Sequence, residues 1–283
     1  MSFPIVEVKT KNQTILHGML LDGHSKSILI FVHGTASNFY ENYFMKFVSE
    51  SLISKKISIL LTNNSGSEVL KAYPPSGAAM ENFEDCVVDI DAWIKFALSK
   101  GYEKIILTGH SIGTEKIVYY MNKGRYTNKV KAVILLGFAD SYGNQMKYIK
   151  GKNNLMFEAA EFVKEGKGNF FLTSDWLSHS GMLPKSAKSY INFFRRNSEL
   201  SKAFPFHSSK LKMYSNISVP ILAIIGDTHE YTFIPIKDAI KLLERENPLI
   251  ECYQIKNCGH DFEGKEVQLT KIITKFLSKV NKV

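Results

Sequence analysis

The segment from Lys104 to Thr114, KIILTGHSIGT, constrains the fold more than any other part of this sequence. It reads as a short apolar run, the turn GHSIG, and then the start of a helix. This order is typical of a nucleophile elbow, in which glycines on both sides relieve crowding around the serine. Ser111 would then lie at a helix N-terminus, where free N–H groups stabilise developing negative charge. The segment is equally compatible with a serine that only caps the helix.

A second strand end carries the groups of an oxyanion hole. Residues 28–32 (ILIFV) predict a buried strand that leads into the loop HGTASN. In hydrolases with a nucleophile elbow, one backbone N–H of this loop and the N–H after the nucleophile stabilise the tetrahedral intermediate. We expect these to be the N–H groups of Thr35 and Ile112.

The general base and the carboxylate that orients it are expected at two later strand ends. Residues 250–255 predict a strand followed by NCGHDF, which makes His260 the best candidate for the base among eight histidines. Residues 219–225 (VPILAII) predict another strand, which ends at GDTHE, where the acid is expected. The chain order of serine, acid and histidine is that of α/β-hydrolases.

Five segments, HGTASNFY, TNNSG, GHSIGT, GDTHEYTFIP and GHDFEGKE, together resemble serine esterases of the α/β-hydrolase superfamily. The resemblance covers nearly the whole chain and includes bacterial feruloyl-esterase-like hydrolases and fungal siderophore-ester hydrolases. It implies the α/β-hydrolase fold and cleavage of esters through an acyl-enzyme on Ser111. The combined pattern is specific for the fold and less specific for the substrate.

The segment expected to carry the triad's acid departs from the sequence pattern of this superfamily. That pattern is Gly-x-x-Asp after the strand, and counting from Gly226 puts His229 at the aspartate position. Asp227 is close to the strand end and has the usual side-chain length, whereas Glu230 is one residue late and longer by one methylene. We favour Asp227 slightly over Glu230, and Asp140, which follows an earlier strand, is a third option.

Strands and helices alternate along the first half of the chain. Short apolar runs alternate with segments of helical periodicity such as residues 82–99. This order predicts an α/β fold with a mostly parallel sheet and helices on both faces. Active sites of such sheets lie at the carboxyl ends of the strands, where the candidate loops are found.

The alternation stops between residues 141 and 218, a region with a helical pattern and many aromatic residues. We expect a helical cap inserted after the sixth strand, with residues 1–140 and 219–283 forming the α/β-hydrolase core. A lid over the catalytic loops excludes water and shapes an apolar pocket. Phe138, Asp140 and Trp176 are the candidates for substrate binding.

Composition narrows the range of partners. The 283 residues, of which 45% are hydrophobic, can bury a full core. The net charge of +9 is spread along a chain without nucleic-acid motifs, so we expect a solvated lysine-rich surface and no nucleic-acid partner. No membrane span or signal-peptide pattern is found, and the three cysteines lack metal-type spacing. We expect a cytoplasmic protein without metal or cofactor, and the sequence leaves the oligomeric state open.

These observations favour a serine hydrolase that cleaves carboxylic esters of small to medium-sized molecules, with acetate or butyrate preferred to long acyl chains. Cleavage of amide or thioester bonds uses the same machinery and is one alternative. A non-catalytic or ligand-binding protein of this fold is the other alternative, because His229 occupies the usual position of the acid.

Overall fold

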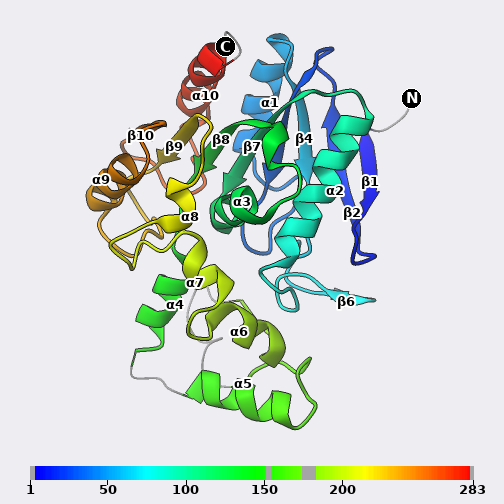
Figure 1. Cartoon of the computed structure of the whole chain (residues 1–283), viewed down its shortest axis with the longest axis vertical. Coiled ribbons are helices and arrows are strands. Elements are labelled where there is room, and N and C mark those ends of the chain that lie inside the picture. The colour runs from blue at the N-terminus through cyan, green and yellow to red at the C-terminus, as the bar shows by residue number, and fades with distance from the viewer. Residues whose placement is uncertain (1–3, 151–153, 174–182, 281–283) are drawn as a thin grey trace.

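The computed structural model describes residues 4–150, 154–173 and 183–280. An eight-stranded sheet lies at its centre, with the strand order β1-β2-β4-β3-β7-β8-β9-β10 (Figure 1). These strands are β1 (Ile5–Lys9), β2 (Ile15–Leu21), β3 (Ser27–Val32), β4 (Ser58–Thr62), β7 (Lys104–His110), β8 (Val130–Leu136), β9 (Ile221–Ile225) and β10 (Ile250–Gln254). Strand β2 runs antiparallel to its neighbours β1 and β4, and all other neighbouring strands are parallel. The mostly parallel α/β sheet expected from the sequence is confirmed.

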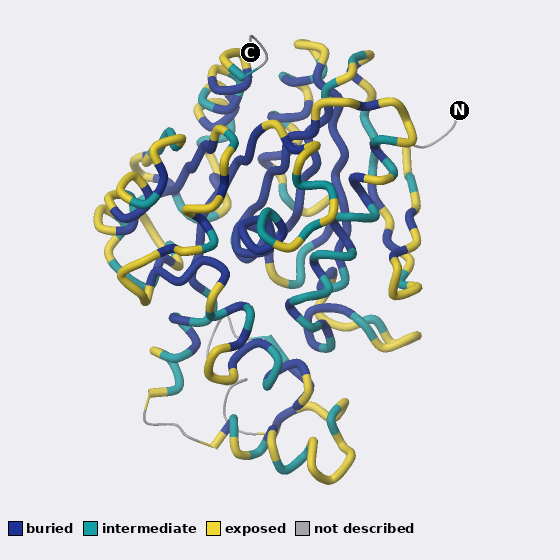
Figure 2. Tube along the Cα trace, viewed as in Figure 1, coloured by how far each residue is buried: buried dark blue, intermediate teal, exposed yellow. Residues whose placement is uncertain are grey.

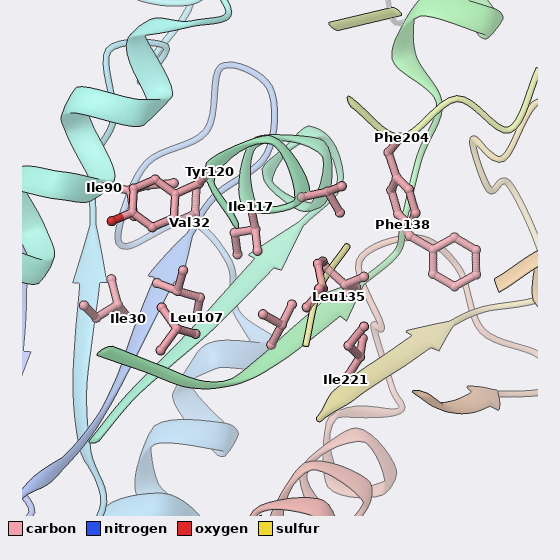
Figure 3. Close-up of a cluster of buried hydrophobic side chains, with 14 of the residues drawn as sticks. Ile30, Val32, Ile90, Leu107, Ile117, Tyr120, Leu135, Phe138, Phe204 and Ile221 are labelled. Carbon is pink, nitrogen blue, oxygen red and sulfur yellow. The ribbon is translucent and has the colours of Figure 1, made fainter. Parts of the chain in front are cut away.

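Helices pack on both faces of this sheet, because apolar strand residues alternate between the faces. In β3, Ile30 and Val32 contact one hydrophobic cluster, whereas Leu29 and Phe31 contact the other. Figure 3 shows the first of these clusters, in which strand side chains meet Ile90 and neighbouring helix residues. Helices α2 (Asp85–Ser99), α3 (Ile112–Lys123), α8 (Lys212–Ser215) and α9 (Ile236–Glu246) cover this face, and α1 (Phe44–Ser54) and α10 (Glu266–Val280) cover the other.

The chain between β8 and β9 is helical in its described parts. It contains α4 (Ser141–Tyr148), α5 (Asn154–Lys164), α6 (Ala187–Phe194) and α7 (Glu199–Ala203), followed by α8. Helices α4 to α7 extend beyond the sheet (Figure 1). They share a hydrophobic cluster that also contains Phe83 and Tyr119. Figure 2 shows exposed residues along much of α5, in contrast to the buried strands. This insertion follows the sixth strand of the main sheet, and its division from the core at residues 141–218 stays a proposal.

A small hairpin precedes α2 and was not expected from the sequence. Its strands are β5 (Lys71–Ala72) and β6 (Pro75–Ser76), and its tip residue Tyr73 is 96% exposed. The chain then turns inward, since Ala78 and Ala79 are almost completely buried. The only other short element outside the sheet and these helices, within the described ranges, is a 3-10 turn at Thr127–Lys129.

The carboxyl ends of the central strands lie side by side. Val32 of β3 pairs with Gly109 of β7, and His110 of β7 pairs with Leu136 of β8. The loops that follow these strands therefore meet at one edge of the sheet, which is where ligands bind in folds of this type.

Candidate active site

Ser111 lies between β7 and α3 in a strained turn. Its backbone angles are φ 57° and ψ −128°, a region that residues with side chains rarely adopt. The glycines around it allow the turn to be this tight. A Cβ atom on Gly109 would lie 2.4 Å from the carbonyl oxygen of Gly113, and one on Gly113 would lie 2.3 Å from that of Val32. The local geometry is therefore that of a nucleophile elbow.

His260 lies on the loop after β10 and is paired with Glu230. Its Nδ1 atom is 2.7 Å from Oε2 of Glu230, and the side chains are 13% and 1% exposed. The second carboxylate oxygen of Glu230 accepts the backbone N–H of Gly226 at 2.8 Å, which fixes the acid in place. Because an ionised carboxylate can only accept, Nδ1 of His260 donates and Nε2 is left as an acceptor.

The Nε2 atom of His260 is buried and has no hydrogen-bond partner among the described residues. A buried polar atom without a partner is uncommon in folded proteins and often marks a reactive site. The structure does not describe a hydrogen bond between this atom and Ser111 Oγ. Catalytic hydrogen bonds of this kind commonly tighten only when substrate binds.

Asp227, the carboxylate slightly favoured from the sequence, does not bind His260. Its oxygens accept the backbone N–H groups of Asn257 at 2.9 Å and Cys258 at 3.0 Å. These bonds, that to Cys258 first, lower the pKa of Asp227. The structure therefore brings Glu230, the alternative, against His260, and not Asp227, which was slightly favoured from the sequence. His229, in the turn between the two carboxylates, has a left-handed backbone with φ 55°. Glu230, the next residue, has a side chain longer by one methylene and reaches Nδ1 of His260.

Two aromatic rings hold the imidazole of His260. The His110 ring lies 4.8 Å from it between centroids, and the Tyr231 ring meets it edge-on at 4.8 Å. Gly137, which follows β8, leaves room for it, since a Cβ atom there would lie 3.0 Å from the His260 ring. His260 therefore rests against the ends of β7 and β8, next in space to the elbow that carries Ser111.

The loop after β3 approaches Ser111 as an oxyanion loop should. A Cβ atom on Gly34 would lie 2.9 Å from Cβ of Ser111. His33 is fully buried and anchors the loop, with Nδ1 at 2.7 Å from the Gly34 carbonyl oxygen and Nε2 at 2.7 Å from Ser67 Oγ. Burial, followed by nearby Lys116, lowers the pKa of His33 to about 3, so this ring stays neutral. The roles of the N–H groups of Thr35 and Ile112 stay predictions.

Phe138 and Asp140, two of the residues expected to bind substrate, make packing and capping contacts instead. Phe138 is completely buried and stacks on Phe206 at 5.5 Å between ring centroids. Figure 3 shows Phe138 in the hydrophobic core beside Phe204. Asp140 is 1% exposed, and its carboxylate accepts the N–H of Gly143 and binds His207 Nδ1 at 2.8 Å. These contacts make Phe138 a packing residue and Asp140 a cap of α4, and they also remove Asp140 as a candidate acid. Trp176 lies outside the described residues.

A surface hollow of about 470 Å³ opens beside His260. It is lined by His229, Tyr231, Gly259, His260, Asp261, Glu263 and Gly264. The described residues contain no group of three or more histidine, cysteine, aspartate or glutamate side chains that could hold a metal ion.

A buried ion pair beneath the elbow was missed by reasoning from the sequence. Lys116 of α3 binds Glu81 at 2.9 Å and the Asn64 side-chain oxygen at 3.0 Å, and both charged side chains are at most 3% exposed. Asn64 belongs to the TNNSG segment after β4, so the pair joins this loop to the helix that follows Ser111. The signal in the sequence is weak, because a lysine on a helix is normally solvated.

Comparison with known proteins extends these observations. A family model described as "Protein of unknown function (DUF1749)" matches residues 10–275. No curated protein sequence matches the chain.

Solved structures of esterases and lipases share the fold. Est1E from Butyrivibrio proteoclasticus, solved with ferulic acid bound, superposes with a TM-score of 0.68 at 13% identity, covering 98% of this chain and 100% of that one. The Pyrococcus furiosus esterase Pf2001 gives 0.63 at 15% identity, covering 98% and 91%. A soluble variant of monoglyceride lipase from Saccharomyces cerevisiae, in complex with a substrate analogue, gives 0.69 at 12% identity, covering 99% and 96%. At these identities the similarity establishes the α/β-hydrolase fold.

Every helix within the described ranges is too short or too polar to cross a bilayer.

Proposed function

The chain belongs to the DUF1749 family, and we propose that it is a serine hydrolase that cleaves carboxylic esters of small to medium-sized molecules. The observation that carries this proposal is the 2.7 Å contact between Glu230 and His260, because it supplies the acid that the sequence pattern lacked. The unpartnered Nε2 atom of His260 and the strained backbone of Ser111 support the same proposal. The esterases and lipases of the same fold agree with it.

In the proposed mechanism, the Glu230 carboxylate accepts a hydrogen bond from Nδ1–H of His260 and orients the ring. Nε2 of His260 then removes the proton from Ser111 Oγ, which attacks the ester carbonyl carbon. The N–H groups of Thr35 and Ile112 stabilise the resulting oxyanion, and loss of one such donor typically costs about 3 kcal/mol. His260 returns the proton to the leaving alcohol, and water activated by the same ring releases the acid from Ser111.

The substrate is proposed to be a small-molecule ester with a short acyl chain. The hollow beside His260, at about 470 Å³, is in the size range of small-ligand sites, although Ser111 is not among its lining residues. We expect p-nitrophenyl acetate or butyrate to be hydrolysed faster than esters of twelve carbons or more. Faster turnover of the long-chain esters would contradict this part of the proposal. Trp176 keeps its proposed role in binding the substrate.

Steady-state hydrolysis of p-nitrophenyl butyrate tests the proposal. The native protein should turn over the ester, and Ser111→Ala should reduce turnover to the rate without enzyme while leaving the circular dichroism spectrum unchanged. Native activity no higher than that of Ser111→Ala on a panel of esters would remove the esterase assignment. A parallel panel of amides and thioesters tests the alternative bond types, which need the same groups.

The proposal of a non-catalytic protein rested on His229 in the position of the acid. The contact of Glu230 with His260 weakens that reason, because a carboxylate is available from the next residue. A bound ligand together with an unreactive Ser111 would restore this alternative.

A further inference from the structure

His110, the residue before Ser111, is the last residue of β7 and is 3% exposed. Its ring is enclosed by three others, at centroid distances of 5.1 Å to Phe44, 6.2 Å to Phe262 and 4.8 Å to His260. A histidine within a G-x-S-x-G turn could serve only to fill this space. Its hydrogen bond shows a more specific task.

The Nε2 atom of His110 lies 3.0 Å from the backbone carbonyl oxygen of His260. A carbonyl oxygen only accepts, so Nε2 of His110 carries the proton and donates it. Burial, followed by the neighbouring His260, lowers the pKa of His110 to about 4. Asp261 is the only carboxylate within ion-pair distance of this ring among the described residues, at 3.9 Å, and it is 80% exposed. A neutral His110 does not add a charge beside the imidazolium that forms on His260 during catalysis.

The other hydrogen bonds of the His260 loop run elsewhere. Asp227 accepts two backbone N–H groups of this loop, and the N–H groups of Asp227 and Thr228 both bind the carbonyl oxygen of Cys258. Glu230 holds the imidazole itself. All of these bonds join the loop that carries His260 to the segment after β9 that carries Asp227 and Glu230. We call these two segments together the acid–base unit.

Within the described residues, the bond from His110 is the hydrogen bond that joins this acid–base unit to β7, the strand that leads into Ser111. We propose that His110 is a positioning residue, which sets the distance between His260 and Ser111 by donating Nε2–H to the His260 carbonyl group. The inference rests on the proposed function, because the distance matters only if the two residues react together. A small misplacement of reacting groups is enough to lower the rate substantially.

Two substitutions separate positioning from space filling. His110→Phe keeps an aromatic ring between Phe44 and Phe262 and removes the donor, whereas His110→Gln keeps a donor at a similar reach and removes the ring. Positioning predicts that His110→Phe loses roughly tenfold to a hundredfold in kcat with KM nearly unchanged, and that His110→Gln stays within about threefold of the native enzyme. Space filling predicts the opposite order, and that result would overturn the inference. His17→Phe, at an exposed strand position, is the control for the substitution itself.

A spectroscopic signature distinguishes positioning from collapse of the site. The proton shared by His260 and Glu230 should give a low-field resonance that persists in both variants, because the acid–base unit is held by other bonds. Loss of this resonance in His110→Phe would show general disruption and contradict positioning.

The tautomer of His110 tests the proposed hydrogen bond without any measurement of activity. Long-range ¹H–¹⁵N correlation in the native protein should show an Nε2–H ring, and an Nδ1–H ring would overturn the inference. A native protein that hydrolyses no ester refutes the proposed function, and a hydrolase with the wrong order of variants refutes the role of His110.

Discussion

At the scale of single residues, Glu230 and Asp227 divide two tasks between them. Glu230 is almost completely buried and binds the imidazole of His260. Asp227 is partly exposed and accepts hydrogen bonds from backbone N–H groups of the loop that carries His260. One carboxylate orients the ring, and the other shapes the loop below it.

Substitution of the two carboxylates should therefore have different effects. Glu230→Gln should lower kcat for p-nitrophenyl butyrate by about 10²–10⁴-fold, since an unoriented imidazole loses most of its value as a base. Asp227→Asn should lower kcat far less and should mainly reduce thermal stability. Each variant removes one negative charge, so the two are matched controls for one another. Steady-state kinetics and thermal unfolding of both variants measure the two effects. A larger kcat loss in Asp227→Asn would reverse this assignment.

The identity of the acid could not be read from the sequence, for a physical reason. Asp227 and Glu230 differ by three positions, and their reach depends on the path of the turn between them. The positive φ angle of His229 decides that path, and a non-glycine residue in this conformation is uncommon. Ser111 and His260 were easier to propose as candidates, because Ser111 directly follows an apolar strand and His260 lies on the loop after another one.

At the scale of elements, the helix after Ser111 is tied to its surroundings by charges. Lys116 and Glu81 join α3 to the loop that precedes α2, and Ser189 of α6 donates to the carbonyl oxygen of Glu81 at 2.7 Å. Helix α3, the loop after β4 and the inserted helix α6 thus meet at one buried pair. Breaking such a pair leaves a buried charge without its partner.

A double-mutant cycle tests this junction. Lys116→Met and Glu81→Gln should each lower the free energy of unfolding by about 3–5 kcal/mol, and together they should cost less than their sum. The exposed pair of Lys26 and Glu103, 67% and 69% exposed, provides the control. Lys26→Met and Glu103→Gln should each change stability by less than about 1 kcal/mol. Urea denaturation gives the values, and strict additivity of the buried pair would argue against a shared junction.

Regular elements were predicted well because hydrophobic periodicity records which side chains face the sheet. Residues 82–99 carry such a pattern, and α2 is found at Asp85–Ser99. The β5–β6 hairpin and the burial of Lys116 were not predicted. Both depend on contacts between distant segments, which leave no local pattern in the sequence.

At the scale of the whole molecule, a second buried lysine links stability to pH. Lys185, next to α6, donates to the Ala78 carbonyl oxygen at 2.8 Å and lies 3.5 Å from the centre of the Phe193 ring. Burial lowers its pKa from 10.5 to about 8, although Glu81 acts in the opposite direction. Between these two values the unfolded chain binds more protons than the folded protein, so stability from this group rises with pH. Below about pH 8 both states are protonated, and the contribution is constant.

Comparison of variants separates the contribution of Lys185 to the pH dependence of stability from the contributions of the other lysines. From pH 7 to pH 10, the native protein should gain about 1–3 kcal/mol in unfolding free energy relative to Lys185→Met, which does not titrate at this position. Lys188→Met, at an exposed position in α6, should show no such change relative to the native protein. Urea denaturation at both pH values measures the difference, and parallel behaviour of native protein and Lys185→Met would contradict it.

The central claim is that Ser111 is a nucleophile activated by His260 and Glu230. Labelling with a fluorophosphonate, followed by intact mass spectrometry, tests this role, because the reagent reacts fast with activated serines. We expect one added phosphonyl group on the folded native protein, slower labelling of Glu230→Gln, and none on Ser111→Ala. An unlabelled native protein, or equal labelling of Ser111→Ala, would show that Ser111 is not an activated nucleophile.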